Sequence, residues 1–183
     1  MPWSQDQAVR ALEFAAEAHG DQEVPGKPYS YVVHLASAAM EVMAAVSFSP
    51  HLNADLAIQC ALLHDVLEDT DTPESVLLAE FGPSVISGVR ALTKNKKLPA
   101  AERMRDSLRR ILEESPEIGM VKLADRICNL AEPPEHWFED KIAAYLEEAL
   151  VIYHSLKHCS DFLSARLKEK IEAYKAYIED EPQ

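Results

Sequence analysis

Apolar residues recur at helical spacing along most of the chain, and this pattern predicts a protein built from helices. The first helix is expected to begin after Ser4, which forms a capping-box pattern with Gln7. Glycines and prolines over residues 20–28 then predict a loop. A second helix is expected over residues 31–45 and a third from about Asn53, where the run AIQCALLHDVL is apolar enough to be nearly buried.

Helical periodicity continues through the second half of the chain. Pro73 is expected at the first position of a helix that Gly82 ends, and Pro83 begins a short helix that reaches the basic turn at residues 94–97. Further helices are expected over residues 100–114, 117–131, 138–158 and 160–179. Strand-like alternation is nowhere sustained, so the predicted fold class is an all-α helical bundle, with residues 1–183 forming a single domain.

Composition and charge narrow the range of functions. Hydrophobic residues make up 48% of the 183 residues and charged residues 27%, which is typical of a folded globular domain rather than of a disordered chain. The 18 Lys and Arg residues against 31 Asp and Glu residues give a net charge of −13. Such a charge repels nucleic-acid backbones and anionic lipid, so we expect neither a nucleic acid nor a membrane as a partner.

The cysteines and the apolar stretches indicate a compartment. Cys60, Cys128 and Cys159 are far apart and odd in number, so they are expected to be reduced thiols in the core. The N-terminal segment lacks the basic start and the unbroken apolar stretch of a signal peptide. No apolar run reaches the length of about 18 residues that a membrane span needs. We therefore expect a cytoplasmic protein.

Ionisable residues gather in the segment LLHDVLEDT at residues 62–70. If this segment is one helix, His64 and Glu68 lie one turn apart on one face. Asp65 and Asp69 are then one turn apart beside them. The four groups form a patch next to the core, which suits a metal site or an acid–base site. A helix end that dips into solvent explains the same pattern about equally well.

Two more polar residues interrupt apolar helical segments. Asp125 lies within KLADRICNL, and a buried carboxylate is rare unless it is paired or bound to a metal. His34 lies within YVVHLA, where a histidine is more often a satisfied core residue than a ligand. Together with His64 and Asp65, these residues offer two histidines and two aspartates from three helices. Such a set suits a divalent ion such as manganese or iron better than structural zinc.

Six motifs, in order along the chain, carry a resemblance to a known family. They are AHGDQ (18–22), PYSYVVH (28–34), LLHDVLEDT (62–70), FGPSV (81–85), LTKNKKLP (92–99) and VKLADRICNL (121–130). These segments resemble the RelA/SpoT-type hydrolase domain of the HD superfamily of metal-dependent phosphohydrolases. In length the chain is similar to the stand-alone small alarmone hydrolases, including the metazoan SpoT-like ones. The similarity covers about residues 5–155, and C-terminal helices are expected beyond it, over residues 156–179.

The resemblance implies an activity and the residues that perform it. The implied reaction removes pyrophosphate from the ribose 3′ position of (p)ppGpp, the nucleotide of the stringent response, and leaves GDP or GTP. The implied cofactor is Mn²⁺, with Fe²⁺ or another divalent ion as an alternative. The implied metal ligands are His34, His64, Asp65 and Asp125. Glu68 and Asp69 match the acidic pair that orients and deprotonates the attacking water, and Asn129 matches the residue that helps to hold the substrate.

An anionic nucleotide also needs positive groups, which this acidic chain must supply locally. The residues expected to bind the substrate are Lys96, Arg103, Lys122, Arg126, Lys141 and Tyr145. The first two and the last two match basic residues or a tyrosine at corresponding places in the small hydrolases. For Lys122 and Arg126 the alternative is a pair of helix-surface charges that flank Asp125.

The sequence departs from the family in the loop that follows AHGDQ. Enzymes of the RelA/SpoT type carry Arg-Lys there, with the guanidinium stacked on guanine, whereas this chain has Gln22 and Glu23 and offers only Lys27 as a partial replacement. A second hypothesis is therefore an HD phosphohydrolase for another nucleotide or phosphorylated cofactor, such as a nucleoside monophosphate or NADPH. A third is a catalytically silent domain that binds an alarmone or a partner, although the complete acidic pair argues against it.

Three further features have a packing interpretation beside a functional one. Trp137 caps the bundle or lines a base pocket, and packing is favoured because buried aromatic residues dominate cores. Cys128 replaces the histidine that is usual at this place in the family, and we expect a packing substitution. The amphipathic helices from His154 to Tyr177 are expected to form core or the surface of a homodimer rather than a ligand site.

Overall fold

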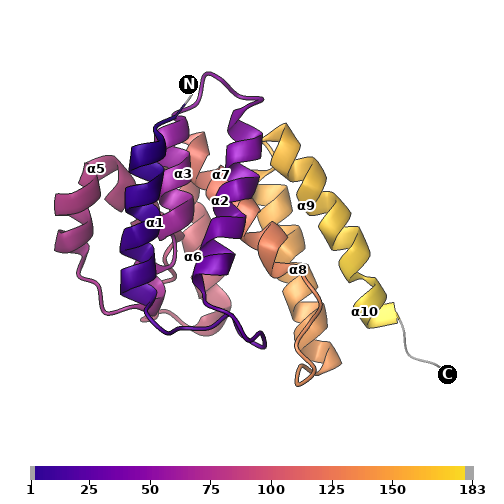
Figure 1. The fold of residues 1–183 in the computed structure, drawn as a ribbon. Coiled ribbons are helices and arrows are strands. Elements are labelled where there is room, and N and C mark those ends of the chain that lie inside the picture. Colours follow the sequence, from indigo (N-terminus) through magenta and orange to yellow (C-terminus); the bar gives the residue numbers. More distant parts are fainter. Residues whose placement is uncertain (1–2, 180–183) are drawn as a thin grey trace.

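The structure is a computed structural model, and it describes residues 3–179 (Figure 1). This part of the chain folds into the helices α1 Gln5–His19, α2 Val32–Val46, α3 Ala54–Leu63, α4 Val66–Asp69, α5 Glu74–Leu92, α6 Ala100–Glu113, α7 Pro116–Asn129, α8 Glu139–Leu156, α9 Asp161–Tyr174 and α10 Ala176–Glu179. The only β pairing within residues 3–179 is an isolated bridge between Glu23 and Ser30. The all-α fold class expected from the sequence is therefore confirmed.

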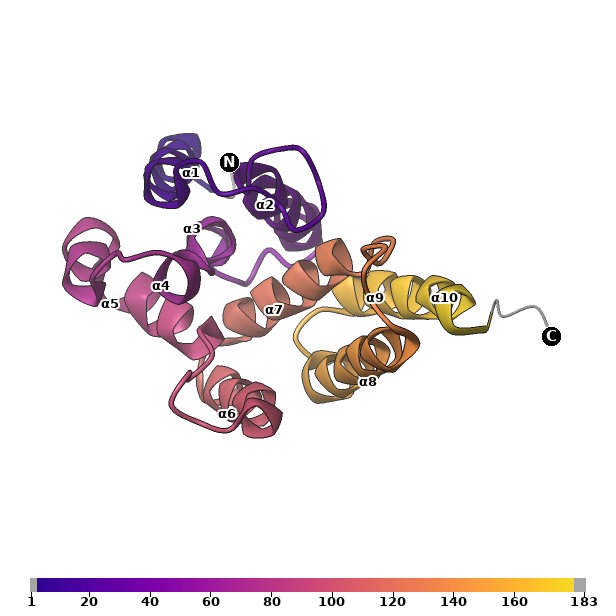
Figure 2. The same cartoon turned by 90° about the horizontal axis from the view of Figure 1, so that it is seen from below.

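Helix α7 is the central element of the bundle. Figure 2 shows it passing between α2 and α3 on one side and α6 and α8 on the other, and α5 and α9 also pack on it. Its residues from Glu117 to Ile127 are all buried, although Lys122, Asp125 and Arg126 lie among them. Charged side chains in a core need partners, and the partners of these residues define the site described below.

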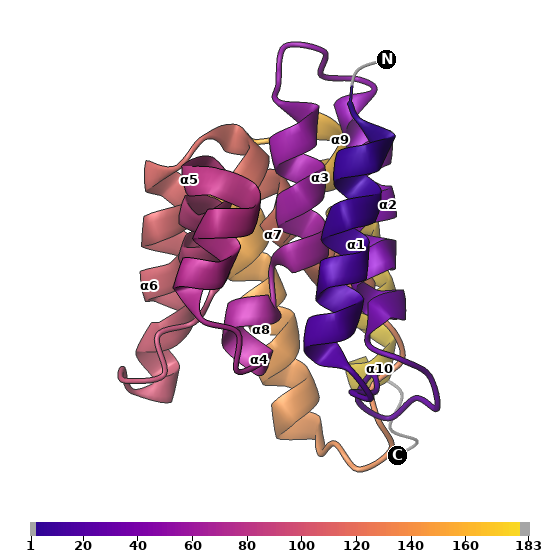
Figure 3. The same cartoon turned by 60° about the vertical axis from the view of Figure 1, so that its left-hand side comes forward.

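Helices α1, α2 and α3 pack against one another and form one side of the bundle (Figure 3). The Ser4 hydroxyl accepts a hydrogen bond from the Gln7 amide at 3.4 Å and so caps α1. A capping box also expects the Gln7 side chain to accept from the Ser4 amide, and this expectation is wrong, because the Ser4 amide donates to Asp55 at 2.7 Å. The Gln7 side chain accepts instead from Gln59 at 3.0 Å. Both contacts tie the beginning of α1 to α3.

Helix α5 is kinked where the sequence predicts a break. Gly82 has φ 82° and ψ 177°, a conformation that favours glycine, and Pro83 follows it. Pro73 precedes the first helical residue rather than occupying that position. By length and apolar composition α5 is the one helix in the described part of the chain that could cross a membrane. The kink interrupts it and Leu77 is fully buried in the core, so we assign α5 to the folded bundle.

The segment LLHDVLEDT does not form the single helix assumed from its spacing. α3 ends at Leu63, and α4 begins at Val66. The His64 ring donates from Nδ1 to the Ala61 carbonyl at 2.7 Å and competes for an acceptor that a continuing helix needs. Asp65 then has φ −100° and ψ −3°, in a sparsely populated region that is common at active sites. Because of this break, the directions of the His64 and Asp65 side chains are not set by the helical geometry of α4.

Gly119 lets α7 approach the loop that joins α8 to α9. A Cβ atom at this position lies 2.4 Å from the Cys159 Sγ and 3.1 Å from its Cβ. Gly119→Ala should therefore destabilise the protein by roughly 1–2 kcal/mol, because overpacking costs about 1–3 kcal/mol and the better helix propensity of alanine returns up to about 1 kcal/mol. Urea denaturation measures the change in free energy of unfolding.

Cys159→Ala provides the matched control for this prediction, because it removes the sulfur that the new methyl group meets. The double variant should recover part of the stability that Gly119→Ala loses, which gives a non-additive double-mutant cycle. Strictly additive effects, or a Gly119→Ala protein as stable as the unmodified one, contradict the packing argument.

Candidate metal centre and adjoining pocket

Four side-chain atoms from three parts of the fold converge below the surface. His34 comes from α2, His64 and Asp65 from the break between α3 and α4, and Asp125 from α7. The His34 Nε2 lies 3.3 Å from the His64 Nε2, 3.7 Å from the Asp65 Oδ2 and 3.4 Å from the Asp125 Oδ1. The His64 Nε2 lies 3.1 Å from the Asp65 Oδ2 and 3.6 Å from the Asp125 Oδ1. We call these four residues the ligand cluster.

The ligand cluster has the dimensions and the chemistry of a divalent metal site. Donor atoms that share one ion at about 2.1 Å are separated from their neighbours by about 3.0–3.4 Å, which is close to the distances above. Two imidazole nitrogens and two carboxylate oxygens suit a hard to borderline ion. The donor atoms of His34, His64 and Asp125 all lie within 4.8 Å of one another, and Asp65 lies beside the two histidines, so the residues present fit a divalent cation.

Neighbouring groups fix the orientation of the ligands. The hydrogen bond from the His64 Nδ1 to the Ala61 carbonyl directs the lone pair of Nε2 toward the cluster. The Tyr31 hydroxyl donates to the Asp65 Oδ2 at 2.6 Å. Burial and the charge of Asp65 raise the pKa of Tyr31, so this hydroxyl stays protonated and acts as a donor. The ring of His19 in turn stacks on Tyr31, with ring centroids 4.9 Å apart.

Asp125 is a buried carboxylate whose two oxygens have different partners. Its Oδ1 faces the histidines and accepts from the Asn129 amide at 2.5 Å, one turn further along α7. Its Oδ2 accepts from the Lys122 ammonium at 2.9 Å, and both side chains are 8% exposed. Burial alone raises the pKa of Asp125, but the charge of Lys122, together with smaller contributions from the neighbouring histidines, outweighs it and holds that pKa well below its usual range. The ligand is therefore ionised.

The acidic pair expected to activate water lies next to the ligand cluster, but its two members have different surroundings. The Glu68 carboxylate accepts from the Lys94 backbone amide at 2.8 Å, and the Lys96 ammonium donates to the Glu68 carbonyl. Desolvation and the charge of Asp65 raise the pKa of Asp69. Asp69 thus shares the electrostatic field of the cluster, whereas Glu68 is held by the turn that follows α5.

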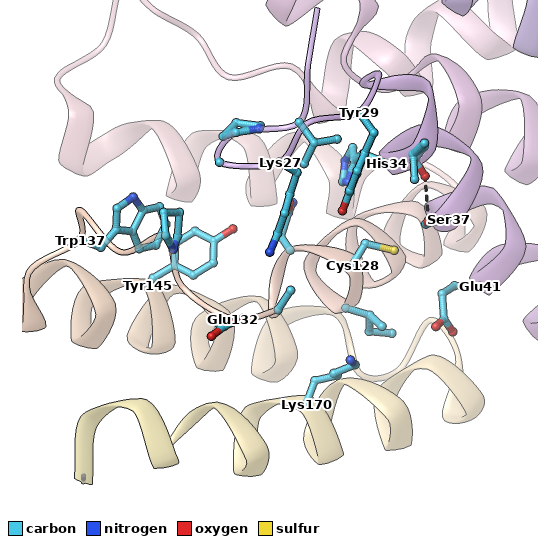
Figure 4. A pocket seen from close by; sticks show the side chains of 18 of the residues that line it. Lys27, Tyr29, His34, Ser37, Glu41, Cys128, Glu132, Trp137, Tyr145 and Lys170 are labelled. Carbon is cyan, nitrogen blue, oxygen red and sulfur yellow. Dashed lines mark hydrogen bonds between the residues drawn. The ribbon is translucent and has the colours of Figure 1, made fainter.

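A pocket of about 400 Å³ opens beside His34 (Figure 4). Its walls come from the loop before α2, from α2 itself, from the end of α7 and the segment after it, and from α8 and α9. Asn129 and Tyr145, both expected to contact the substrate, line it, and so does Trp137. Trp137 is also packed against the core, as its packing interpretation expects.

The other residues expected to bind substrate lie elsewhere. Lys96 is beside the acidic pair, and Arg103 braces the same turn by donating to the Leu98 carbonyl at 2.9 Å. The Lys141 ammonium lies 4.0 Å from the centre of the Trp137 ring, outside the pocket lining.

Lys122 and Arg126 are buried, so the helix-surface alternative for them is wrong. Neither lines the pocket. Lys122 neutralises Asp125, and Arg126 pairs with Glu148 while its guanidinium carbon lies 4.3 Å from the centre of the Tyr145 ring. The sequence interpretation failed here because α7 is buried on all sides, whereas a single apolar stripe was assumed.

Two expectations about cysteine need correction. Cys60 is buried, but Cys128 and Cys159 are only partly buried, so the three do not all belong to the core. Cys128 lines the pocket instead of serving only as a packing substitution. Burial and the nearby charges of Asp125 and Glu41 raise the pKa of Cys128 to about 12, so it is a protonated thiol and a poor nucleophile near neutral pH.

Sequence reasoning missed Tyr31 and the cations of α9. Tyr31 lies three residues before His34, a spacing that puts both side chains on one side of a helical turn, and this signal was available. Arg166 and Lys170 also line the pocket. Their place at the site depends on how α9 packs against α7, which periodicity alone does not determine.

Comparison with known proteins identifies the class of protein that this fold and site define. The HD-domain family pattern matches residues 11–160, a range that contains the ligand cluster and the acidic pair. The chain therefore belongs to the HD-domain family.

Within that family, similar proteins carry a specific activity in their names. The mouse (Mus musculus) guanosine-3′,5′-bis(diphosphate) 3′-pyrophosphohydrolase MESH1 is 31% identical over 173 residues, which cover 91% of this chain and 93% of the mouse protein. The human (Homo sapiens) MESH1 is 32% identical, over 88% of this chain and 91% of the human one. A solved structure described as a metazoan ortholog of SpoT that hydrolyzes ppGpp superposes with a TM-score of 0.78 at 27% identity, over 91% of this chain and 94% of that one. The resemblance stated from the sequence, and the enzyme class of an HD-domain hydrolase, are confirmed.

Tyr31→Phe tests whether the hydroxyl bond to Asp65 supports metal binding. The change keeps the aromatic ring and removes only the donor, so the apparent metal affinity should fall about tenfold, the lower end of typical effects for groups that orient a ligand. A competition titration against a chelator measures it, with Tyr29→Phe as the control from the same loop. Equal affinities for Tyr31→Phe and the unmodified protein exclude this orienting role.

Proposed function

We propose that this protein is a (p)ppGpp 3′-pyrophosphohydrolase that uses Mn²⁺. The observation that carries the proposal is that relatives named for this activity match about nine tenths of both chains. The ligand cluster, the acidic pair and the pocket residue Asn129 all lie within the HD-domain match. Manganese is proposed because it is the ion that the resemblance to RelA/SpoT-type hydrolases implies, and two nitrogen and two oxygen donors are compatible with it. The protein is proposed to work in the cytoplasm, and a homodimer stays a prediction.

The proposed reaction is a hydrolysis at phosphorus. Water adds to the phosphorus attached to the ribose 3′ oxygen, and the bond between that phosphorus and the 3′ oxygen breaks. The 3′ oxygen takes up a proton, so the products are pyrophosphate and GDP or GTP. A divalent ion on the ligand cluster supplies Lewis-acid chemistry, which polarises a phosphoryl oxygen and eases the deprotonation of water.

The residues around the cluster are given separate tasks. Asp69, in the field of the cluster, accepts the proton of the attacking water. Glu68, fixed by the Lys94 amide, orients that water. Asn129 lies between the ligand oxygen of Asp125 and the pocket, and contacts the phosphate that reacts.

The second candidate is an HD phosphohydrolase with another nucleotide or phosphorylated cofactor as substrate. One observation favours it: the loop from Val24 to Tyr29 forms part of the pocket wall, and the guanidinium that stacks on guanine in RelA/SpoT-type enzymes is missing from it. Lys27 is the only cation in this loop. An ammonium stacks on a base less well than a planar guanidinium does.

Turnover of a nucleotide panel by protein reloaded with Mn²⁺ distinguishes the candidates. The panel contains ppGpp, pppGpp, their adenine counterparts, NADPH and nucleoside monophosphates, and chromatography measures the products. Pyrophosphate should be released from ppGpp faster than from its adenine counterpart. Activity on NADPH or monophosphates alone supports the second candidate. A metal-loaded protein that is silent across the panel rejects both in favour of a binding domain.

Changes in the acidic pair test the tasks assigned to it. Glu68→Gln and Asp69→Asn should retain a stoichiometric metal ion but lower kcat by about 100-fold or more, as expected when the group that orients or the group that deprotonates the water is lost. Asp71→Asn is the control, because Asp71 is an exposed carboxylate just beyond α4. Metal analysis and steady-state kinetics on one preparation separate the two effects. A near-normal kcat for Asp69→Asn removes Asp69 from proton transfer, and a near-normal kcat for Glu68→Gln removes Glu68 from orienting the water.

A further inference from the structure

The pocket beside the ligand cluster has two chemically different ends. Figure 4 shows Trp137 and Tyr145 on one side and Glu41 on the other, with His34 and Cys128 between them. The first end is aromatic: the two rings meet edge to face, with centroids 5.2 Å apart. The second end is formed by α2 and by the cations that α9 contributes. A ligand that fills the pocket therefore meets aromatic faces at one end and positive charge at the other.

The two cations of α9 are in different states. Arg166 forms a two-pronged ion pair with Glu41, at 2.7 and 2.5 Å, so its charge is neutralised and it fastens α9 to α2. Lys170 lies one turn further along α9 and directs its amino group at the pocket (Figure 4). No ion pair with Lys170 exists within residues 3–179. A half-buried ammonium without a carboxylate partner favours an anionic ligand.

We propose that Lys170 binds the second phosphate group of the substrate, the 5′-diphosphate that does not react. This assignment rests on the proposed function and makes it more specific. A guanosine bis(diphosphate) carries a base and two diphosphates on one ribose. With the 3′-diphosphate at the ligand cluster and the base against Tyr145, the remaining group of the substrate is the anionic 5′-diphosphate. The end of the pocket formed by α2 and α9 favours an anionic group, so the two match.

Lys170 lies outside residues 11–160, the part of the chain that the HD-domain family pattern matches. The contact therefore comes from α9, outside the range that the family pattern matches. It also gives the pocket a means to distinguish nucleotides by their 5′ end. Nucleosides and 5′-hydroxyl nucleotides lack the group that Lys170 binds, so they gain nothing from it.

Binding of GDP and of guanosine to the metal-loaded protein tests the proposal without turnover, because GDP carries the 5′-diphosphate and no 3′ phosphate. Lys170→Ala should weaken GDP binding about tenfold, the effect of losing one charge-assisted hydrogen bond, and leave guanosine binding unchanged. Calorimetric titration measures both dissociation constants. Lys168→Ala is the control, an exposed lysine on the same helix outside the pocket lining, and should change neither. Lys170→Arg should keep most of the GDP affinity.

Three results overturn the proposal: equal GDP affinity for Lys170→Ala and the unmodified protein, equal losses for GDP and guanosine, and an unmodified protein that binds GDP no better than guanosine. Kinetics with ppGpp add a second measurement. Lys170→Ala should raise KM about tenfold and change kcat by less than about twofold, because the contact is made equally in the ground state and the transition state. An unmodified protein that fails to hydrolyse ppGpp yet shows the Lys170-dependent GDP affinity rejects the proposed function alone.

Discussion

The buried carboxylate of Asp125 is the constraint on which the site and much of the fold depend. It lies on α7, which is covered by six other helices, so its charge has little access to bulk water. Removing one partner from a buried ion pair costs about 3–5 kcal/mol, so Lys122 on the preceding turn is needed for the protein to keep this carboxylate ionised. Two histidines approach the other oxygen from α2 and from the end of α3. The packing of three helices is therefore coupled to the charge of one side chain.

The same helix joins the ligand cluster to the pocket. Asp125 and Asn129 are one turn apart and hydrogen-bonded, and Cys128 and Asn129 lie in the pocket wall. A shift of α7 along its axis moves the ligand and the wall together, so their relative positions are preserved. The close approach at Gly119 sets this register at the far end of α7. The position of the metal ligand Asp125 and the shape of the pocket wall are therefore coupled through α7.

Sequence reasoning predicted what depends on local pattern. The helical class follows from periodicity, and His34 and Asp125 were recognisable because polar residues in apolar segments need a reason to be buried. The break at His64 was missed, because it arises from a side-chain hydrogen bond to a carbonyl that spacing does not reveal. Lys122 was assigned to the substrate or to the surface, because its burial depends on α8 and α9 covering the far side of α7. Lys170 was missed for a similar reason, since its direction depends on the packing of α9.

Electrostatics set a limit on how this protein can bind a polyanion. With a net charge of −13 the chain as a whole repels a nucleotide with two diphosphates, so long-range steering opposes encounter. Attraction must then come from short-range contacts, and several cations near the site are already paired: Arg166 in the pocket wall and the buried Arg126 and Lys122 are each committed to a carboxylate. The ammonium of Lys170 and a divalent ion at a fixed separation recognise two phosphate groups held at that separation. A polyanion with a different spacing of phosphate groups is repelled by the net negative charge of the protein and does not gain these two contacts. The acidic surface therefore contributes to selectivity.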